Sequence, residues 1–232
     1  MAKRAKKSAP RKGHVIGRFI TFEGGEGSGK STQIQMLADH LKSEGIETLV
    51  TREPGGSPGA EIIRHLLLSG VGKLLGADAE TLLFAAARDD HVHQVIKPAL
   101  EKGTWVLCDR FTDSTAAYQG AAGKVDPAFI RALTYATIGR LEPDLTFILD
   151  VPVAVGLQRA IKRRGRAVAD RFEGESLSFH ESLRDAYRKI AEENSVRCVV
   201  IDANNEPAEV AERIWRAMQD RLPTCVSVGA GA

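Results

Sequence analysis

The residues best suited to chemistry in this sequence form a glycine-rich stretch that ends in Lys30 and Ser31. Residues 24–31 fit the pattern G-x-x-x-x-G-K-[ST] at every fixed position. Glycines let successive backbone N–H groups point into one concavity, which forms a nest for an anion. The Lys30 ammonium adds a full positive charge, and the Ser31 hydroxyl is a suitable ligand for Mg²⁺. The pattern therefore predicts a phosphate-binding loop.

The flanking residues support this interpretation. Residues 19–22 read as a buried strand, and Ile34, Leu37, Ala38 and Leu41 share one face of a helix. The alternative, a flexible glycine turn with a chance Lys-Ser, does not explain a strand and a helix on either side. We therefore expect a nucleoside triphosphate to bind here. The candidate residues for binding it are Gly24, Gly25, Glu26, Gly27, Ser28, Gly29, Lys30, Ser31 and Thr32.

A second candidate group follows another apolar strand, at residues 105–108. That strand ends in Asp109, and an acid at this position reaches Mg²⁺ directly or through water in phosphate-transfer sites. Arg110 comes next and is suited to a bidentate phosphate clamp. Ser31 and Asp109 are thus the candidate metal ligands.

The elements that must position these residues alternate along the chain. Strand-like runs occur at residues 19–22, 48–50, 105–108, 145–149 and 196–201, separated by helical patterns. This alternation predicts an α/β protein with a five-stranded parallel sheet covered by helices on both faces, in three layers. One long helix is expected from Asp78, as its N-cap, to about residue 100, with Pro98 as a point of disturbance. Its expected apolar stripe is Ala79, Leu82, Leu83 and Ala86.

Length and charge limit the domain organisation. A chain of 232 residues allows one domain, which we place at residues 17–222. Residues 1–16 are basic and without an acid, and we expect a disordered extension there, with a frayed tail at residues 223–232. Without the seven basic residues of positions 1–18, 25 basic residues face 30 acidic ones. The charge is therefore not that of a nucleic-acid-binding domain, and no nucleic-acid partner is expected.

The spacing of the cysteines and the length of the apolar runs bear on the cellular location of the protein. Cys108, Cys198 and Cys225 show no disulfide or metal spacing, which suits a reducing compartment, so a cytoplasmic protein is expected. The sequence has no apolar run of 18 residues and its basic N-terminus lacks an apolar core. We therefore expect neither a membrane span nor a secretory signal.

An arginine-rich segment lies at about residues 162–174, between two glycines, and suggests a mobile lid. Together with Arg110 it directs much positive charge at one cleft. Such charge fits an acceptor that is itself a phosphate monoester, because two unit charges about 4 Å apart repel by roughly 4 kcal/mol at an effective dielectric of 20. Such an acceptor is largely dianionic at neutral pH and needs no strong general base. The residues thus favour a small kinase that phosphorylates a phosphate.

Phe84 and Arg88 lie four positions apart on the long helix and so share a face. On spacing alone they are either a Phe at the edge of the core with a solvated Arg, or a pair that binds a ligand.

At this point the sequence resembles the bacterial thymidylate kinase family, over about residues 17–221. The matching stretches are FEGGEGSGKST, TREPGG, FAAAR, a strand ending in DRF, STAAYQG, PDLTFILDV and an Arg-rich segment ending in DRFE. The resemblance implies the transfer of the ATP γ-phosphoryl group to dTMP, with Mg²⁺, which gives dTDP and ADP for DNA synthesis. The alternatives are another deoxynucleoside monophosphate kinase, or a nucleotide-binding regulator without turnover.

The resemblance also implies roles for individual residues. Phe84 would stack on thymine, Arg88 would bind a thymine carbonyl, and Tyr118 would pack where a 2′-hydroxyl would lie. Lys30, Asp109, Arg110 and a lid arginine, Arg163, Arg164 or Arg166, would carry catalysis, with Arg163 and Arg164 favoured. The family is typically homodimeric, so a homodimer is expected. The implied dTMP-binding residues are Glu26, Arg52, Phe84, Arg88, Arg110, Thr115, Tyr118, Gln119 and Glu173.

Overall fold

The computed structural model describes residues 17–69, 74–165 and 172–222. The predicted basic extension at residues 1–16, the predicted tail at residues 223–232 and the central part of the predicted lid, Arg166 included, lie outside these ranges.

Five parallel strands form one sheet in the order β2-β3-β1-β4-β5, which confirms the predicted sheet. The central strand β1 is buried along its whole length, because β-branched and aromatic side chains alternate to both faces of the sheet. Since all strands run the same way, their carboxyl ends meet at one edge. The strands are β1 (Phe19–Glu23), β2 (Thr48–Arg52), β3 (Trp105–Asp109), β4 (Leu145–Asp150) and β5 (Cys198–Asp202).

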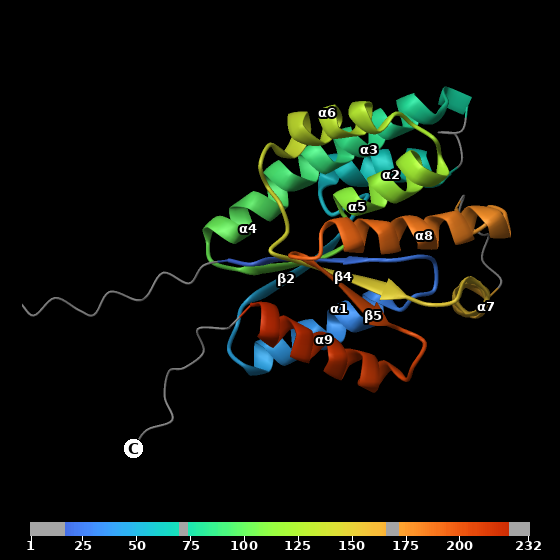
Figure 1. The fold of residues 1–232 in the computed structure, drawn as a ribbon. Helices are drawn as coiled ribbons and strands as arrows, with labels where there is room; N and C mark the ends of the chain where they lie inside the picture. Colours follow the sequence, from blue (N-terminus) through green and yellow to red (C-terminus); the bar gives the residue numbers. More distant parts are fainter. Residues whose placement is uncertain (1–16, 70–73, 166–171, 223–232) are drawn as a thin grey trace, which may run out of the picture.

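Helices cover both faces of this sheet and complete the three predicted layers (Figure 1). Helices α1 (Lys30–Ser43) and α9 (Pro207–Arg221) lie on one face and bury a large apolar cluster against it. The opposite layer holds two smaller clusters. It contains α2 (Pro58–Leu68), α3 (Ala77–His91), α6 (Pro127–Ile138) and α8 (Leu177–Glu193), whereas α7 (Val153–Arg164) lies beside the phosphate-binding loop.

The long helix predicted for residues 78–100 is in fact three consecutive segments. Helix α3 ends at His91, a π-helical turn η2 spans Val92–Ile96, and α4 spans Lys97–Glu101. Pro98 lacks a backbone N–H, so the regular hydrogen-bond ladder is interrupted at this point. The predicted N-cap was also wrong, because Gly76 occupies that position and Asp78 lies in the first turn.

The predicted apolar stripe of α3 was wrong as well. Leu82 is 48% exposed, whereas Glu80, Thr81, Arg88 and His91 are buried. This helix turns a polar face inward because it lines a polar site, as described below. Apolar periodicity alone therefore assigned the wrong face to the core.

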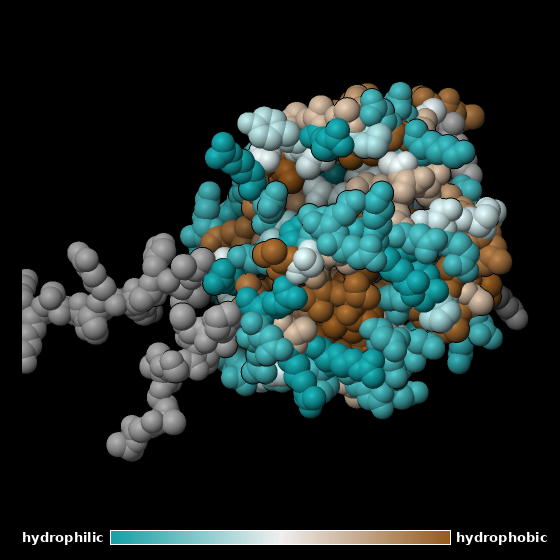
Figure 2. Space-filling view, viewed as in Figure 1, coloured by the Kyte–Doolittle hydropathy of each residue, from teal (hydrophilic) through white to brown (hydrophobic). Residues whose placement is uncertain are grey.

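The stretch STAAYQG, residues 114–120, lies beside the site. It belongs to a short helix α5 (Thr112–Thr115) that continues into a π-helix η3 (Ala116–Ala122). At the edge of the sheet, Val200 of β5 is 45% exposed, and Figure 2 shows hydrophobic side chains at the surface there.

None of the helices within the described ranges is both long and apolar enough to cross a membrane.

Candidate active site

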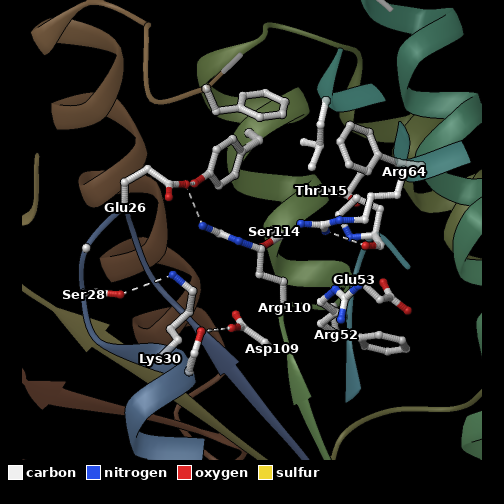
Figure 3. A pocket seen from close by; sticks show the side chains of 18 of the residues that line it. Glu26, Ser28, Lys30, Arg52, Glu53, Arg64, Asp109, Arg110, Ser114 and Thr115 are labelled. Atoms are coloured by element: carbon white, nitrogen blue, oxygen red, sulfur yellow. Dashed lines mark hydrogen bonds and ion pairs between the residues drawn. The ribbon is translucent and has the colours of Figure 1, made fainter. Parts of the chain in front are cut away.

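A cavity of about 400 Å³ opens at the carboxyl ends of β1, β2 and β3. One side is formed by the glycine-rich loop that joins β1 to α1, and the other by side chains from α3, α5 and η3 (Figure 3). Most of the predicted site residues line this one cavity. They are Glu26, Gly27, Ser28, Gly29, Lys30, Ser31, Thr32, Arg52, Phe84, Arg88, Asp109, Arg110, Thr115, Tyr118, Gln119 and Arg163.

The backbone of the loop needs its glycines. Gly27 has φ of 66°, and a Cβ there would collide with the carbonyl oxygen of Gly156 on α7. Gly24 has φ of 137°, and a Cβ there would lie 2.5 Å from the carbonyl oxygen of Leu149. Glycine is thus required both for the left-handed conformation and for the close approach of neighbouring backbone. The loop leads directly into the N-terminus of α1, where free N–H groups favour an anion.

Lys30 is held against this loop. Its Nζ donates to the carbonyl oxygens of Gly24 and Gly25, both at 3.0 Å, and to Ser28 Oγ at 3.3 Å. Burial, and then the nearby charge of Arg110, lower the pKa of Lys30 to about 8. A bound phosphate would favour the charged form, since an opposite charge stabilises it.

Ser31 and Asp109 meet beside Lys30. The Ser31 hydroxyl donates to Asp109 Oδ2 at 2.8 Å, which links the start of α1 to the end of β3. A hydroxyl and a carboxylate are hard oxygen ligands of the kind that Mg²⁺ prefers, and few protein ligands suffice because Mg²⁺ keeps several waters and phosphate oxygens. The two residues therefore fit a Mg²⁺ site. No cluster of three or more His, Cys, Asp or Glu side chains suited to a metal occurs among the residues described.

Glu26 extends from the loop toward the opposite side of the cavity (Figure 3). Its Oε1 accepts hydrogen bonds from Arg110 Nη2 and from the Tyr118 hydroxyl, both at 2.8 Å. Burial raises the pKa of this carboxyl, but the charges of Arg110 and Lys30 outweigh that effect and hold the pKa at about 2. Glu26 is therefore ionised near neutral pH and joins the two sides of the cavity.

Arg110 has an unusual backbone conformation. Its φ of 72° lies in the left-handed region, which costs a non-glycine residue of order 1 kcal/mol or more. Its N–H donates to Phe22 O at 2.9 Å, and its Nη1 donates to Gly24 O at 3.1 Å. The guanidinium also lies over the Tyr118 ring, 4.9 Å from the centroid. The surrounding residues thus hold this arginine in one orientation, at the centre of the cavity.

A buried charged cluster fixes Arg88. Its Nε donates to Glu53 Oε2 at 2.7 Å, and its Nη2 donates to Phe111 O and to Thr115 Oγ1, both at 3.0 Å. On its other side, Glu53 Oε1 lies 3.1 Å from His91 Nδ1. Among the residues that the structure describes, these bonds engage Nε and Nη2 and leave Nη1 available to a ligand in the cavity that Arg88 lines. The solvated interpretation of Arg88 is wrong, since its side chain is only 3% exposed.

Aromatic side chains form the wall next to Arg88. Phe84 lies 6.3 Å from Phe172 between ring centroids, and Phe172 lies 5.1 Å from Tyr118, edge to face. Gln119 also lines the cavity, and its Nε2 donates to Glu80 Oε1 at 3.2 Å. Planar apolar surfaces beside a free guanidinium N–H suit a flat ring that carries a carbonyl group.

The predicted residues at the edge of the site differ in their surroundings. Arg52 lines the cavity but is exposed and pairs with Glu61 at 2.8 Å. Arg163 and Arg164 both pair with Glu173, at 3.1 and 2.8 Å. Of these two arginines only Arg163 lines the cavity.

Comparison with known proteins decides the family. A family model described as "Thymidylate kinase" matches residues 22–214. A protein named thymidylate kinase from Afipia carboxidovorans is 79% identical over 232 residues, covering 100% of both chains. Another so named, from Bradyrhizobium diazoefficiens, is 67% identical and covers 95% of this chain and 97% of its own. The chain belongs to the thymidylate kinase family.

The solved structures agree with this assignment. The crystal structure of thymidylate kinase from Ehrlichia chaffeensis has a TM-score of 0.71 and 34% identity, and it covers 88% of this chain and 100% of its own. The thymidylate kinase family match begins inside β1 and ends within α9. It therefore includes every residue that lines the cavity.

Sequence reasoning missed several residues of this thymidylate kinase family site. Glu53 lies in the stretch TREPGG, but no role was predicted for it, nor for His91 or Tyr187. Glu23, at the end of β1, carried the clearest available signal, because an acid closes an otherwise apolar strand just before the glycine-rich loop. Arg64, which donates to Pro54 O at 2.7 Å and lines the cavity, carried none.

Proposed function

We propose that this chain transfers the γ-phosphoryl group of ATP to dTMP, which gives dTDP and ADP. The observation that carries the proposal is the contact between Glu26 of the phosphate-binding loop and Arg110 at the other side of one continuous cavity. A donor triphosphate on the loop and a second nucleotide beside Arg110 would meet where these two residues touch. Membership of the thymidylate kinase family supports dTMP as that second nucleotide.

The geometry supports phosphoryl transfer without a general base. The acceptor phosphate is largely a dianion at neutral pH, so the difficulty is to bring two anions together in line. Lys30 and Arg110 offset that repulsion from opposite sides, and Arg163 adds charge at the rim. Mg²⁺, when held by Ser31 and Asp109, would neutralise further charge on the phosphates.

The acceptor side fits a thymine base and a deoxyribose. We propose that Phe84 stacks on the base, that Arg88 Nη1 donates to a carbonyl of its ring, and that Thr115 and Gln119 lie beside it. Tyr118 would exclude a 2′-hydroxyl, while Arg52, Glu26 and Glu173 would act near the monophosphate. Residues 17–222 would then form one catalytic domain, with residues 162–174 as its lid.

The quaternary state and the location are further parts of the proposal. Neighbouring helices α2, α3 and α6 carry exposed apolar side chains, Ile62, Leu82 and Tyr135, in one layer of the molecule. We assign this layer to a homodimer interface. Cys108 and Cys198 are free thiols, which supports a cytoplasmic location.

The experiment that tests the reaction is a coupled assay of ADP release with dTMP, dUMP, dCMP, dGMP and UMP as acceptors. Preference for dTMP is the expected result. A preference for another monophosphate would show that the acceptor is that nucleotide and not dTMP. ADP release independent of any acceptor would overturn the proposal.

A further inference from the structure

Behind Arg110 lies a buried polar cluster that comes from three separate elements. Glu23 ends β1, Ser114 belongs to α5, and Tyr187 projects from α8. Glu23 is 0% exposed and Tyr187 is 2% exposed. A carboxylate buried so completely needs hydrogen-bond partners, and its partners here are the groups that surround Arg110.

The protons of the two hydroxyl groups are directed by Glu23. Ser114 Oγ donates to Glu23 Oε2 at 2.6 Å, and the Tyr187 hydroxyl donates to the same oxygen at 3.0 Å. A hydroxyl has only one proton, so each oxygen then offers lone pairs on its other side. Arg110 Nη1 donates to both oxygens, at 3.3 Å to Ser114 and 3.2 Å to Tyr187.

The same carboxylate also holds the backbone beyond Arg110. Glu23 Oε1 accepts from the N–H of Phe111 at 2.7 Å and from the N–H of Ser114 at 3.3 Å. These N–H groups follow Arg110, whose φ of 72° is otherwise unfavourable. One side chain thus fixes both the backbone and the guanidinium of the arginine.

We propose that Glu23 is a positioning residue that aims the Arg110 guanidinium at the acceptor phosphate, by keeping the hydroxyl protons of Ser114 and Tyr187 directed away from it. The inference rests on the proposed function, because it takes dTMP as the acceptor.

Protonation of Glu23 would reverse this arrangement. Oε1 already accepts from two backbone N–H groups, so a proton would reside on Oε2 and donate to one hydroxyl. The proton of that hydroxyl would then turn toward Arg110 or toward the second hydroxyl, 2.9 Å away, and in either case it would occupy space or a lone pair that Arg110 Nη1 uses. The charged groups that act on Glu23 are Asp113, Arg110 and Lys30, while Ser114, Tyr187 and the N–H of Phe111 donate to it. Burial and then Asp113 raise the pKa of Glu23 to about 7, against the opposing effects of Ser114 and Arg110. Binding of dTMP should therefore weaken as the pH falls below 7.

The decisive variant is Glu23→Gln, which keeps the shape and the acceptor for the backbone N–H groups. Its amide would donate to both hydroxyl groups and turn their protons toward Arg110. We expect KM for dTMP to rise about tenfold or more, as is usual when a hydrogen bond to a charged group is lost, with KM for ATP changed less than about twofold. At pH 8 the melting temperature should equal or exceed that of the wild type, because a neutral amide replaces a buried carboxylate.

Two further variants separate positioning from structure. Tyr187→Phe removes one acceptor of Arg110 and should raise KM for dTMP in the same direction. Thr146→Val is the matched control, because it deletes a buried hydroxyl that pairs with Thr21 and Arg197 and makes no contact with Arg110. It should lower the melting temperature and leave KM for dTMP unchanged.

The results of these experiments distinguish a positioning role of Glu23 from a structural role, and both from failure of the proposed function. Between pH 6 and 8 the ratio of KM for dTMP in Glu23→Gln to that in the wild type should grow. If Glu23→Gln loses stability and raises KM for dTMP and for ATP equally, Glu23 is merely structural. Wild-type KM values in Glu23→Gln would also refute the inference. If the wild type does not phosphorylate dTMP, the proposed function fails. A crystal structure of Glu23→Gln then still decides the inference, since Arg110 must leave Ser114 and Tyr187.

Discussion

Glu26 Oε1 and Arg110 Nη2 lie 2.8 Å apart and join the phosphate-binding loop to the opposite side of the cavity. Both side chains are more than four-fifths buried. An acid in a loop built for a triphosphate would repel its ligand if it faced that ligand alone. Its contacts are instead with Arg110 and Tyr118, which supports our proposal that it organises the acceptor side.

This contact predicts how stability depends on pH. The pKa of Glu26 is held at about 2 in the folded protein, below its ordinary value of 4.5. A carboxyl with a lowered pKa adds stability above its unfolded pKa, and that stability is lost as the pH falls toward the folded pKa. Urea unfolding from pH 7 to 2 should show the wild type losing its advantage over Glu26→Gln, by about 3 kcal/mol in total between about pH 5 and pH 2. A difference independent of pH would contradict the ion pair.

The Lys30→Ala variant should lose on the order of 10² or more in kcat, because it removes a positive group aimed at developing charge. Binding of dTMP should change little, since the hydrogen bonds that Lys30 makes among the described residues go to the loop. Steady-state rates and calorimetry with dTMP measure the two effects. Lys42→Ala, on the exposed side of the same helix, is the control and should keep wild-type rates. Near-normal turnover in Lys30→Ala would remove this residue from the proposed mechanism.

Much of the fold could be predicted because its signals are local. The five strands are short apolar runs, and the order of strands and helices leaves few arrangements for a parallel sheet. Some helix ends are equally local: serine is a favoured N-cap residue, and the Ser176 hydroxyl at the start of α8 accepts from the N–H of Phe179 at 3.2 Å. The glycine-rich loop was equally accessible, because its pattern is contiguous and its backbone demands glycine.

The rest of the site could not be predicted because it depends on partners distant in sequence. Tyr187 fits the apolar stripe of α8, and only the fold places its hydroxyl on Glu23, 164 residues away. On α3 the polar side chains Arg88 and His91 are buried because Glu53, on another element, pairs with both. Hydrophobic periodicity assumes that the core is apolar, and it fails where a helix lines a polar cleft.

The buried pair of Arg88 and Glu53 predicts two separable effects. Arg88→Ala should raise KM for dTMP more than KM for ATP, because Arg88 faces the acceptor side. It should also lower the free energy of unfolding by about 3 kcal/mol or more, since Glu53 loses its partner in a buried site. The double variant Arg88→Ala with Glu53→Gln should recover stability but not affinity for dTMP. Chemical unfolding and steady-state kinetics test this, and equal losses for both substrates would assign Arg88 a structural role only.

The proposed dimer interface predicts that charge on α6 separates the subunits. Tyr135 is 69% exposed, and Tyr135→Glu would place a charge in the apolar layer of α2, α3 and α6. Sedimentation velocity should then show a monomer where the wild type is a dimer. Val196→Glu is the matched control, because Val196 is 88% exposed outside this layer, just before β5. A wild-type monomer, or an unchanged dimer in Tyr135→Glu, would argue against this interface.

The position of the Tyr118 side chain predicts that its ring selects nucleotides with a deoxyribose. Its hydroxyl donates to Glu26 at 2.8 Å and its ring lies under the Arg110 guanidinium, so the ring is fixed on the side of the cavity that we assign to the acceptor. Tyr118→Ala should remove the bulk that excludes a 2′-hydroxyl and raise the relative kcat/KM for UMP over dUMP. Tyr118→Phe keeps the ring and deletes only the hydroxyl, so it should retain the wild-type preference while KM for dTMP rises, because Glu26 loses one donor. An unchanged ratio of UMP to dUMP in Tyr118→Ala would show that another side chain, or the binding of the base itself, rejects ribonucleotides. The comparison of the two variants therefore separates the steric contribution of the ring from the electrostatic contribution of its hydroxyl.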